Sequence, residues 1–478
     1  MAPRDTSAPE KIETDLCIIG GGSGGLSVAA GAVQMGARVV LVEGGKMGGD
    51  CLNYGCVPSK ALIASGKHAH AMGSGAPFGI ASAEAVVDYS AAKDHVADVI
   101  ATIAPHDSVE RFEGLGVRVI EAYGRFTGPA TLEAGGHEIT ARRFVIATGS
   151  TPFVPPIPGI DTVPYLTNET LFDLREKPSH LIVIGAGPIG LEMAQAHARL
   201  GCRVTVLEAA TALAKEDPEL AAVVLARLAA EGVEIVEGAK VTEVGGTAGA
   251  ITLTAEDGRG WEGSHLLVAV GRKPSIDRLD LEAAGVAATP RGITVDAKLK
   301  TSNKRIYAIG DVAGGLQFTH LAGYHAGIVV RSALFGLPAK AGTAHIPWAT
   351  FTDPEIAQVG LTEAEARAAH GEKLEVLRFP YKENDRAIAE RATEGLVKVM
   401  VVKGRPVGAS IVGKQAGELI HLWALVIANR LKIGAVAAMV APYPTLGELN
   451  KRAAGQYYVP RLFESAFVKR VVRLVQRF

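Results

Sequence analysis

The sequence predicts an α/β protein in which one strand–turn–helix pattern occurs twice. Three observations support this: glycine supplies 56 of the 478 residues, hydrophobic residues make up 48% but aromatic residues only 5%, and a spaced glycine triplet follows two separate apolar strands. Such a composition is typical of βαβ layers with tight strand-to-helix turns, and it argues against disorder. The chain is about three times the ~150 residues of an average domain, so several domains are expected.

Charge and cysteine content exclude several classes of protein. The chain has 49 basic and 50 acidic residues, a formal net charge of −1, so no long-range field favours nucleic acid. The N-terminal residues are polar and unlike a signal peptide, and no apolar run reaches the ~18–20 residues that cross a bilayer. We therefore expect a cytoplasmic protein, in which the four cysteines do not form structural disulfides.

The first copy of the pattern starts with the apolar strand Asp15–Ile19 and closes with the strand Arg38–Glu43. Between them Gly20, Gly22 and Gly25 fit G-x-G-x-x-G and lead into a helix of small residues. The first glycine allows a tight turn, the second lets a pyrophosphate approach the backbone, and the third lets helix and strand pack closely. The helix N-terminus offers N–H groups to the phosphate, and the final acid, Glu43, can accept from ribose hydroxyls.

The second copy starts with the strand Leu181–Ile184 and closes with Glu208. Its glycines are Gly185, Gly187 and Gly190. The first glycine and the acid are 23 residues apart in both copies. Because strands, glycines and acids all repeat, the sequence predicts two Rossmann-like dinucleotide sites.

Glu208 bears on the choice of nucleotide at the second site. A carboxylate there accepts from a free ribose 2′-OH and repels a 2′-phosphate. No arginine follows it in Ala-Ala-Thr-Ala-Leu-Ala. We therefore expect NAD(H) rather than NADP(H); the alternative is that Glu208 only caps an exposed strand end.

A cysteine pair, Cys51 and Cys56, follows the first unit directly. On a regular helix residues five apart lie about 140° apart with Cα atoms more than about 8 Å apart, whereas a disulfide needs under about 7 Å. The pair must therefore lie at a distorted helix start, which Gly48, Gly49 and Gly55 permit. With Lys60 one turn on, a thiol at a helix N-terminus should have a lowered pKa.

This pattern favours a redox-active dithiol. A zinc half-site and two inert core thiols are the alternatives. The other two cysteines, Cys17 in the first strand and Cys202 just before a later strand, are interpreted as small core residues.

The stretch from Gly48 to Lys60 fits G-G-x-C-x-x-x-x-G-C-x-P-[ST]-K. On this signature the chain resembles the flavoprotein disulfide reductases, the pyridine nucleotide-disulfide oxidoreductases of the glutathione reductase, lipoamide dehydrogenase and mercuric reductase type. Further family motifs occur in order along the chain: Ala147-Thr148-Gly149, Val268–Pro274 with Gly271, Thr301–Asp311, and Thr352–Glu355.

The resemblance implies two cofactors, FAD at the first fingerprint and NAD(H) at the second. Residues expected near FAD, besides the first glycine triplet and Glu43, are Gly49, Lys60, Gly124, Thr148, Gly149 and Asp311. The helix that starts near Thr319 would point its N-terminal dipole at the flavin; His320 is interpreted as a packing or capping residue. Gly271 would close the NAD domain.

The resemblance also assigns roles at the redox-active centre. Cys51 would attack the substrate, and Cys56 would be the charge-transfer thiol beside the flavin. Lys60 would lie near the flavin N5 and pair with Glu192, for which a surface salt bridge is the alternative. Electrons would run from NADH through FAD to the disulfide bond, the flavin supplying the hydride chemistry.

The implied architecture is a FAD domain at 1–153, an NAD domain at 154–277, a return to the flavin side at 278–345 and an α+β interface domain at 346–478. The last of these would form a homodimer, because Tyr443 and Glu448 would have to reach the dithiol of a partner subunit.

Two positions depart from the family pattern. Disulfide-reducing members end with His-Pro-Thr-x-x-Glu, but here Tyr443 stands in the place of the histidine that acts as acid–base. A phenol with a pKa near 10 is a poor base at neutral pH. A tyrosine there resembles mercuric reductase, yet no cysteine follows Cys202 to make that enzyme's C-terminal pair. Asp50 replaces the usual threonine, and no role follows from the residues.

The sequence therefore predicts an NADH-linked FAD oxidoreductase with a disulfide or soft metal ion as acceptor. The alternatives are a dihydrolipoamide dehydrogenase and, in another functional class, a flavin-binding protein with vestigial turnover.

The last residues, Val468–Phe478, interleave four basic residues with apolar ones. A basic amphipathic helix can lie on a membrane surface. Packing against the interface domain is the more ordinary interpretation, and it is the one we expect.

Overall fold

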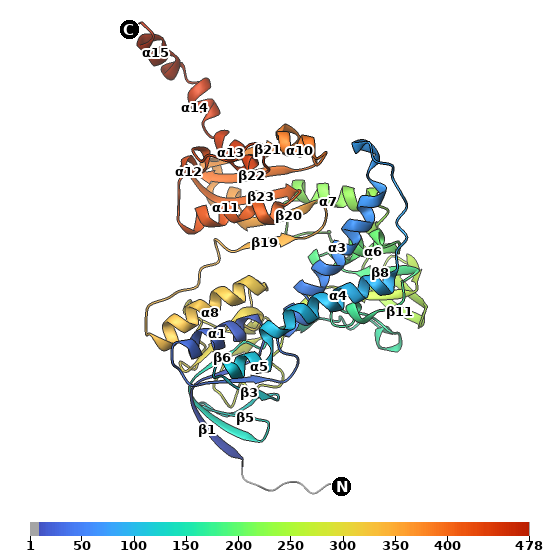
Figure 1. Ribbon diagram of the computed structural model, residues 1–478, viewed down its shortest axis with the longest axis vertical. Coiled ribbons are helices and arrows are strands. Elements are labelled where there is room, and N and C mark those ends of the chain that lie inside the picture. Colours follow the sequence, from blue (N-terminus) through green and yellow to red (C-terminus); the bar gives the residue numbers. More distant parts are fainter. Residues whose placement is uncertain (1–8, 478) are drawn as a thin grey trace. The chain divides into compact units, whose positions relative to one another are not determined.

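The computed structural model describes residues 9–477 (Figure 1). The chain divides into two compact units. Unit 1 contains the described chain up to Pro156, together with Tyr165–Lys177 and Leu267–Ala341. Unit 2 contains Ile157–Pro164, Pro178–Leu266 and the chain from Gly342 onward. Unit 1 thus holds the first glycine pattern and the cysteine pair, and unit 2 holds the second glycine pattern.

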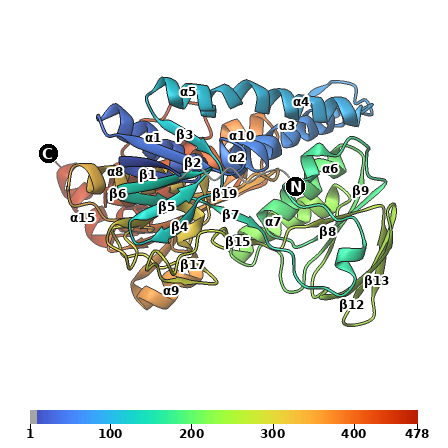
Figure 2. The same ribbon diagram turned by 90° about the horizontal axis from the view of Figure 1, so that it is seen from below.

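A seven-stranded sheet forms the centre of unit 1, in the order β3-β2-β1-β6-β5-β4 with β18 added to β6 (Figure 2). Its strands are β1 (Glu10–Ile19), β2 (Val39–Glu43), β3 (Arg118–Glu121), β4 (Arg125–Gly128), β5 (Thr131–Ala134), β6 (His137–Ile146) and β18 (Ile306–Ala308). The strands β1, β2, β3, β6 and β18 pair in parallel, and β5 and β4 continue the sheet antiparallel from β6.

The helices of unit 1 are α1 (Ser23–Gln34), α2 (Gly49–Asn53), α3 (Cys56–Gly73), α4 (Tyr89–Ile103), α5 (Val109–Gly114) and α8 (Thr319–Leu334). Helices α1 and α8 pack together, and so do α3 and α4. A short antiparallel ribbon joins β7 (Ser150–Pro152) to β15 (Arg272–Pro274), and another joins β16 (Ala288–Thr289) to β17 (Gly292–Ile293).

The strand β1 is buried on both faces from Leu16 to Ile19, as a parallel strand covered on both sides requires. Cys17 and Ile19 pack with Phe144 in one core, while Leu16 and Ile18 pack in a second core with side chains of α1 and α8. The thiol of Cys17 is a core group, as expected, and its burial raises its pKa.

The first part of unit 2 has a sheet in the order β10-β9-β8-β14 and an antiparallel ribbon of β11, β12 and β13. The strands are β8 (His180–Ile184), β9 (Arg203–Leu207), β10 (Glu234–Val236), β11 (Val241–Thr247), β12 (Ala250–Ala255), β13 (Gly260–Gly263) and β14 (His265–Val268), with helices α6 (Pro188–Arg199) and α7 (Pro218–Ala230). Cys202, just before β9, is buried, as expected.

The second part of unit 2 is an antiparallel sheet in the order β19-β20-β23-β22-β21. The strands are β19 (Pro347–Thr350), β20 (Glu355–Gly360), β21 (Leu374–Pro380), β22 (Leu396–Val402) and β23 (Arg405–Gly413). The helices are α9 (Glu363–His370), α10 (Asp385–Ala389), α11 (Ala416–Ala428), α12 (Ile433–Ala437) and α13 (Glu448–Gly455). Helix α11 packs on β20 and β23, with Trp423 fully buried and donating to Asn450 at 2.8 Å.

The C-terminal helices α14 (Val459–Phe463) and α15 (Ala466–Val475) lead away from α13 (Figure 1). Neither helix contains a buried residue. The expected packing of this tail against the interface domain of its own chain is therefore wrong: the apolar face of α15 finds no apolar surface within unit 2. Among residues 9–477 no helix is long and apolar enough to cross a membrane.

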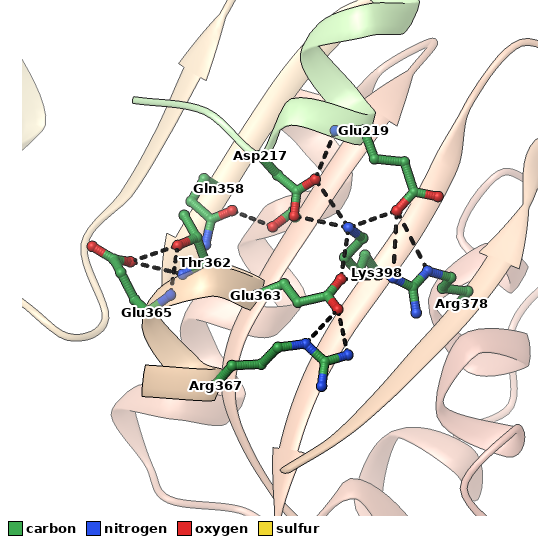
Figure 3. Close-up of polar contacts among 10 residues, drawn as sticks. Asp217, Glu219, Gln358, Thr362, Glu363, Glu365, Arg367, Arg378 and Lys398 are labelled. Carbon is green, nitrogen blue, oxygen red and sulfur yellow. Dashed lines mark hydrogen bonds and ion pairs between the residues drawn. The ribbon is translucent and has the colours of Figure 1, made fainter. Parts of the chain in front are cut away.

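A buried lysine joins the two parts of unit 2 (Figure 3). Lys398 of β22 is 2% exposed at its side chain and contacts three carboxylates: Asp217, the N-cap of α7, at 2.8 Å, Glu219 at 2.7 Å and Glu363 at 2.9 Å. Arg378 and Arg367 contact the outer carboxylates. Three cations, Lys398 and the two arginines, thus face the three carboxylates from the segments of α7 and α9.

We predict that Lys398→Met destabilises the protein by roughly 3–5 kcal/mol, because it leaves the buried Asp217 carboxylate without its cation. Against the effect of burial, hydrogen bonds from Lys398 hold the pKa of Glu219 and Glu363 below 4.5. The contribution of Glu219 and Glu363 to the free energy of unfolding is therefore present above pH 4.5 and is lost as pH falls through their lowered pKa.

Thermal unfolding measured from pH 7 downward checks this prediction. The variant should show a lower midpoint at pH 7 and a weaker dependence on acidification than the parent chain. Lys240→Met, which breaks the exposed pair with Glu256, is the matched control and should cost at most about 1 kcal/mol. Equal midpoints for Lys398→Met and the parent would contradict the prediction.

Candidate functional site

The first glycine turn is shaped by backbone contacts at two of its three positions. Gly20 has φ +109°, and a Cβ there would lie 2.3 Å from the carbonyl oxygen of Ala147. A Cβ on Gly25 would lie 1.8 Å from the carbonyl oxygen of Gly20. At Gly22, by contrast, the nearest atom to a Cβ is the Cα of Gly49 at 3.7 Å. The middle glycine therefore leaves room in front of the turn.

That room lies at the N-terminus of α1, where Gly22 is the N-cap and supplies no side-chain hydrogen bond. The first N–H groups of a helix need acceptors, and a phosphate supplies them. The turn thus fits the pyrophosphate of a dinucleotide, with the first and third glycines setting the backbone and the second admitting the ligand.

The second glycine turn repeats this geometry in unit 2. Gly185 has φ +106°, and a Cβ on Gly190 would lie 2.0 Å from the carbonyl oxygen of Gly185. A Cβ on Gly187 would meet no atom within 4 Å, and Gly187 is the N-cap of α6 without a side-chain hydrogen bond. Both turns therefore fit a dinucleotide, as the repeated pattern predicted.

The acids that close the two patterns hold equivalent positions. Glu43 accepts from the backbone N–H of Gly21 and Gly45, each at 2.5 Å. Glu208 accepts from the N–H of Ala186 at 2.8 Å and of Ala210 at 3.0 Å. Each carboxylate is thus fixed beside its turn, and with about four acceptor sites it can still accept from a ribose.

The cysteine pair lies where one helix stops and the next begins. Cys51 belongs to the short helix α2, whereas Cys56 is the first residue of α3 after the N-cap Gly55. Gly48 and Gly49 enter α2 with φ of +84° and +60°. The regular helix that would separate the two thiols is therefore interrupted, as their spacing predicted.

The dithiol turn packs directly on the first dinucleotide turn. A Cβ on Gly49 would lie 2.7 Å from the Cα of Gly22, and Gly48 pairs with Gly22 as an isolated parallel bridge. The N–H of Gly48 also donates to the carbonyl of Gly21 at 2.9 Å. The two motifs thus share one wall of backbone, in which a side chain at position 49 has no room.

The pKa values of the two thiols are shifted in opposite directions. The hydrogen bond with Cys51, the Thr319 hydroxyl 3.4 Å away and the charge of Lys60 lower the pKa of Cys56 to about 6. The same Cys51–Cys56 interaction, together with burial, raises the pKa of Cys51. Cys56 is therefore the more acidic of the two thiols, which is the polarity that the family resemblance implies.

Asp50, whose role did not follow from the sequence, is part of a polar cluster beside the dithiol. It forms an ion pair with Arg272 of β15 at 2.9 Å and accepts from Asn168 at 3.0 Å. Asn168 also donates to the carbonyl of Tyr54 at 3.1 Å, between the two cysteines. These contacts tie α2 and the following turn to β15, and a threonine at position 50 could not form the ion pair.

The cluster continues to the predicted flavin aspartate. Arg272 donates to the hydroxyl of Ser150 at 2.7 Å, and that hydroxyl donates to Asp311 at 2.6 Å. Burial raises the pKa of Asp311. The sequence did not predict a role for Ser150 or Asn168, because neither belongs to a recognised motif. Arg272 lies within the motif Val268–Pro274, but no role was predicted for it.

Other residues predicted near FAD are also in unit 1. Thr148 donates to the carbonyl of Ser275 at 2.8 Å, and Gly149 has φ +66°. A Cβ on Gly124 would lie 3.1 Å from Leu132, so this glycine lets the chain pass close to β5. Gly271, expected to close the NAD domain, has φ +124° and lies in unit 1. The helix α8 begins at Thr319, where its start was expected.

Glu192 lies in α6 of unit 2 and is 5% exposed. Its carboxylate accepts from the N–H of Phe351 at 2.8 Å. The alternative of a surface salt bridge is therefore wrong, because the side chain is buried. Lys60 belongs to unit 1, so its pairing with Glu192 stays a prediction.

Tyr443 is 70% exposed, in the loop before α13. Its hydroxyl donates to Asp385 at 2.9 Å, and this carboxylate raises the pKa of the phenol. Glu448 is the first residue of α13 and is partly buried. Tyr443 is thus open to a second subunit, but its phenolate, the form that could act as a base, is less populated at neutral pH than that of an ordinary tyrosine.

We predict that Asp50→Asn lowers the pKa of Cys56 further, because the Asp50 charge opposes the thiolate. In the reduced protein the rate of Cys56 alkylation, followed by mass spectrometry from pH 4 to 9, should have its midpoint below that of the parent. Asp15→Asn, which removes a charge from the surface pair with Arg38, is the control. An unchanged or raised midpoint would contradict the prediction.

Comparison with known proteins agrees with this geometry. Residues 14–326 match the family model of the pyridine nucleotide-disulphide oxidoreductases, and residues 346–454 match the dimerisation domain of the same family. A mercuric reductase of Bacillus cereus is 36% identical over 446 residues, which cover 92% of this chain and 70% of the relative. A dihydrolipoyl dehydrogenase of Bacillus subtilis is 34% identical over 447 residues, which cover 91% and 96%.

Solved structures show the same similarity. A Cu(II) complex of the HOCl-induced flavoprotein disulfide reductase RclA from Escherichia coli has a TM-score of 0.83 and 28% identity, covering 93% of this chain and 99% of that one. LpdA from Mycobacterium tuberculosis has a TM-score of 0.85 and 28% identity, with the same coverage.

Proposed function

Because the chain belongs to the pyridine nucleotide-disulphide oxidoreductases, which use FAD and NAD(P)H, we propose that it oxidises NADH and reduces a disulfide or a soft metal ion through Cys51 and Cys56. The observation that carries this proposal is the dithiol turn, packed on the first dinucleotide turn with its thiolate at Cys56. Bound FAD would supply the hydride chemistry between NADH and the disulfide.

Cys51 and Cys56 would have different roles in the reaction. NADH gives two electrons and the Cys51–Cys56 disulfide becomes a dithiol, with Cys56 left as thiolate. Cys51 then attacks the acceptor: a disulfide receives the two electrons, the Cys51 proton and one proton from solvent and leaves as two thiols, whereas a bound metal ion receives the electrons alone and the Cys51 proton goes to solvent. Either exchange restores the Cys51–Cys56 disulfide.

The choice of NADH rests on Glu208. Its carboxylate is fixed at the second turn by Ala186 and Ala210, where a 2′-phosphate would be repelled. The expected result is a higher kcat/KM for NADH than for NADPH. The substitution Glu208→Gln should lower the ratio of these two kcat/KM values.

The acceptor class rests on Tyr443. Its phenol donates to Asp385 and has a raised pKa, so it does not replace the histidine base of dithiol exchange. The relatives include mercuric reductases, and one structural neighbour is a Cu(II) complex. These similarities support a metal ion as one member of the acceptor class. In the homodimer Tyr443 and Glu448 would lie beside the dithiol of the partner subunit.

A steady-state panel of acceptors tests the proposal: lipoamide, glutathione disulfide, Hg(II), Cu(II) and quinones with NADH. We expect turnover with a metal ion or a small disulfide and slow turnover with lipoamide at pH 7. Tyr443→His should raise lipoamide turnover by about 10²-fold, the worth of a general base, while Tyr443→Phe should not.

Fast lipoamide reduction by the parent chain at neutral pH would contradict the argument from Tyr443. Full activity of Cys51→Ser with any acceptor would contradict the role of the dithiol.

A further inference from the structure

The helix α15 separates apolar and basic residues onto two sides. At 100° per residue, its larger apolar side chains fall within an arc of about 160°. They are Phe467, Val468, Val471, Val472, Leu474 and Val475. The basic residues Lys469, Arg470 and Arg473 fall on the opposite side, Arg477 follows the end of the helix, and no acidic residue occurs after Glu464. Such a helix has the composition of one that lies in a lipid–water interface.

The apolar side of α15 is uncovered by the described chain. No residue of the helix is buried, and Phe467 is 75% and Val475 65% exposed. Phe463 at the end of α14 is also exposed. A contiguous exposed apolar face rimmed by charges marks a surface that binds something.

From these observations we propose that α15 holds the enzyme on an anionic lipid bilayer, with its apolar face among the acyl chains and its basic face at the headgroup phosphates. The helix is about 15 Å long, half the ~30 Å of a bilayer core, so it would lie on the membrane and not cross it. This proposal is independent of the electron acceptor.

Charge favours an anionic bilayer over the pairing of two α15 helices. Without the four basic residues of the tail, the chain has 45 basic and 50 acidic residues, so its body is negative. An anionic surface would repel that body and attract the tail. Pairing of two α15 helices would cover the apolar faces but place eight positive charges close together with no acid of either tail to neutralise them.

Sedimentation with vesicles tests the proposal, using the full chain with FAD bound. It should sediment with phosphatidylcholine–phosphatidylglycerol vesicles at about 0.1 M salt and much less with phosphatidylcholine alone. Binding should fall steeply at about 1 M salt, where the Debye length is about 3 Å.

Substitutions on the basic face and on the apolar face of α15 test the two contributions to binding separately. Arg473→Gln with Arg477→Gln should lower partitioning roughly tenfold or more, and Val471→Glu should abolish it. Lys240→Gln with Arg259→Gln removes the same charge from exposed sites elsewhere in unit 2 and should leave binding unchanged. A chain that ends at Ser465 should lose binding but keep its FAD and its rate of reduction by NADH.

Three outcomes would overturn the proposal. The first is that the parent chain does not sediment with anionic vesicles. The second is that the chain that ends at Ser465 sediments as much as the parent chain. The third is that the chain that ends at Ser465 is a monomer where the parent chain is a dimer, because a second copy would then be the occupant of the apolar face.

Discussion

The contact between two glycine turns is the constraint on which the site depends. Gly48 and Gly49 of the dithiol turn lie against Gly22 of the first dinucleotide turn, with no room for a Cβ at position 49. Both turns belong to unit 1, and the segment that would receive a pyrophosphate is packed directly against the segment that carries the thiols. Part of the excess of glycine in this chain is explained by such close contacts between backbone segments, which leave no room for a side chain.

Charge is arranged around that contact. Thr319 and the charge of Lys60 lower the pKa of Cys56, while Asp50, which has the opposite effect, is paired with Arg272. The pairing keeps an acid next to a thiolate without leaving two free negative charges together. Through Ser150 the same arginine reaches Asp311, so the dithiol turn and the predicted flavin aspartate are connected by three polar contacts.

Local pattern predicted much of this site. Each of the two glycine patterns and the dithiol signature is a short continuous stretch of sequence. The glycine positions and the helix break between Cys51 and Cys56 could therefore be predicted. Contacts between distant segments could not: Asn168 and Asp50 are 118 residues apart, and Lys398 and Asp217 are 181 apart. Lys398 stands in an otherwise apolar strand, LVKVMVV, which alone says nothing of the acids around it. The tail was misjudged because amphipathicity does not identify the surface that the apolar face meets.

The central claim is that Cys56, and not Cys51, is the thiolate of the dithiol turn. An anaerobic titration of the FAD-loaded enzyme with NADH tests it most directly, through the long-wavelength absorbance of a thiolate beside the flavin. We expect this band in the parent enzyme, its fading as pH falls through about 6, and its presence in Cys51→Ser but not in Cys56→Ser. A band that persists in Cys56→Ser and is lost in Cys51→Ser would contradict the account.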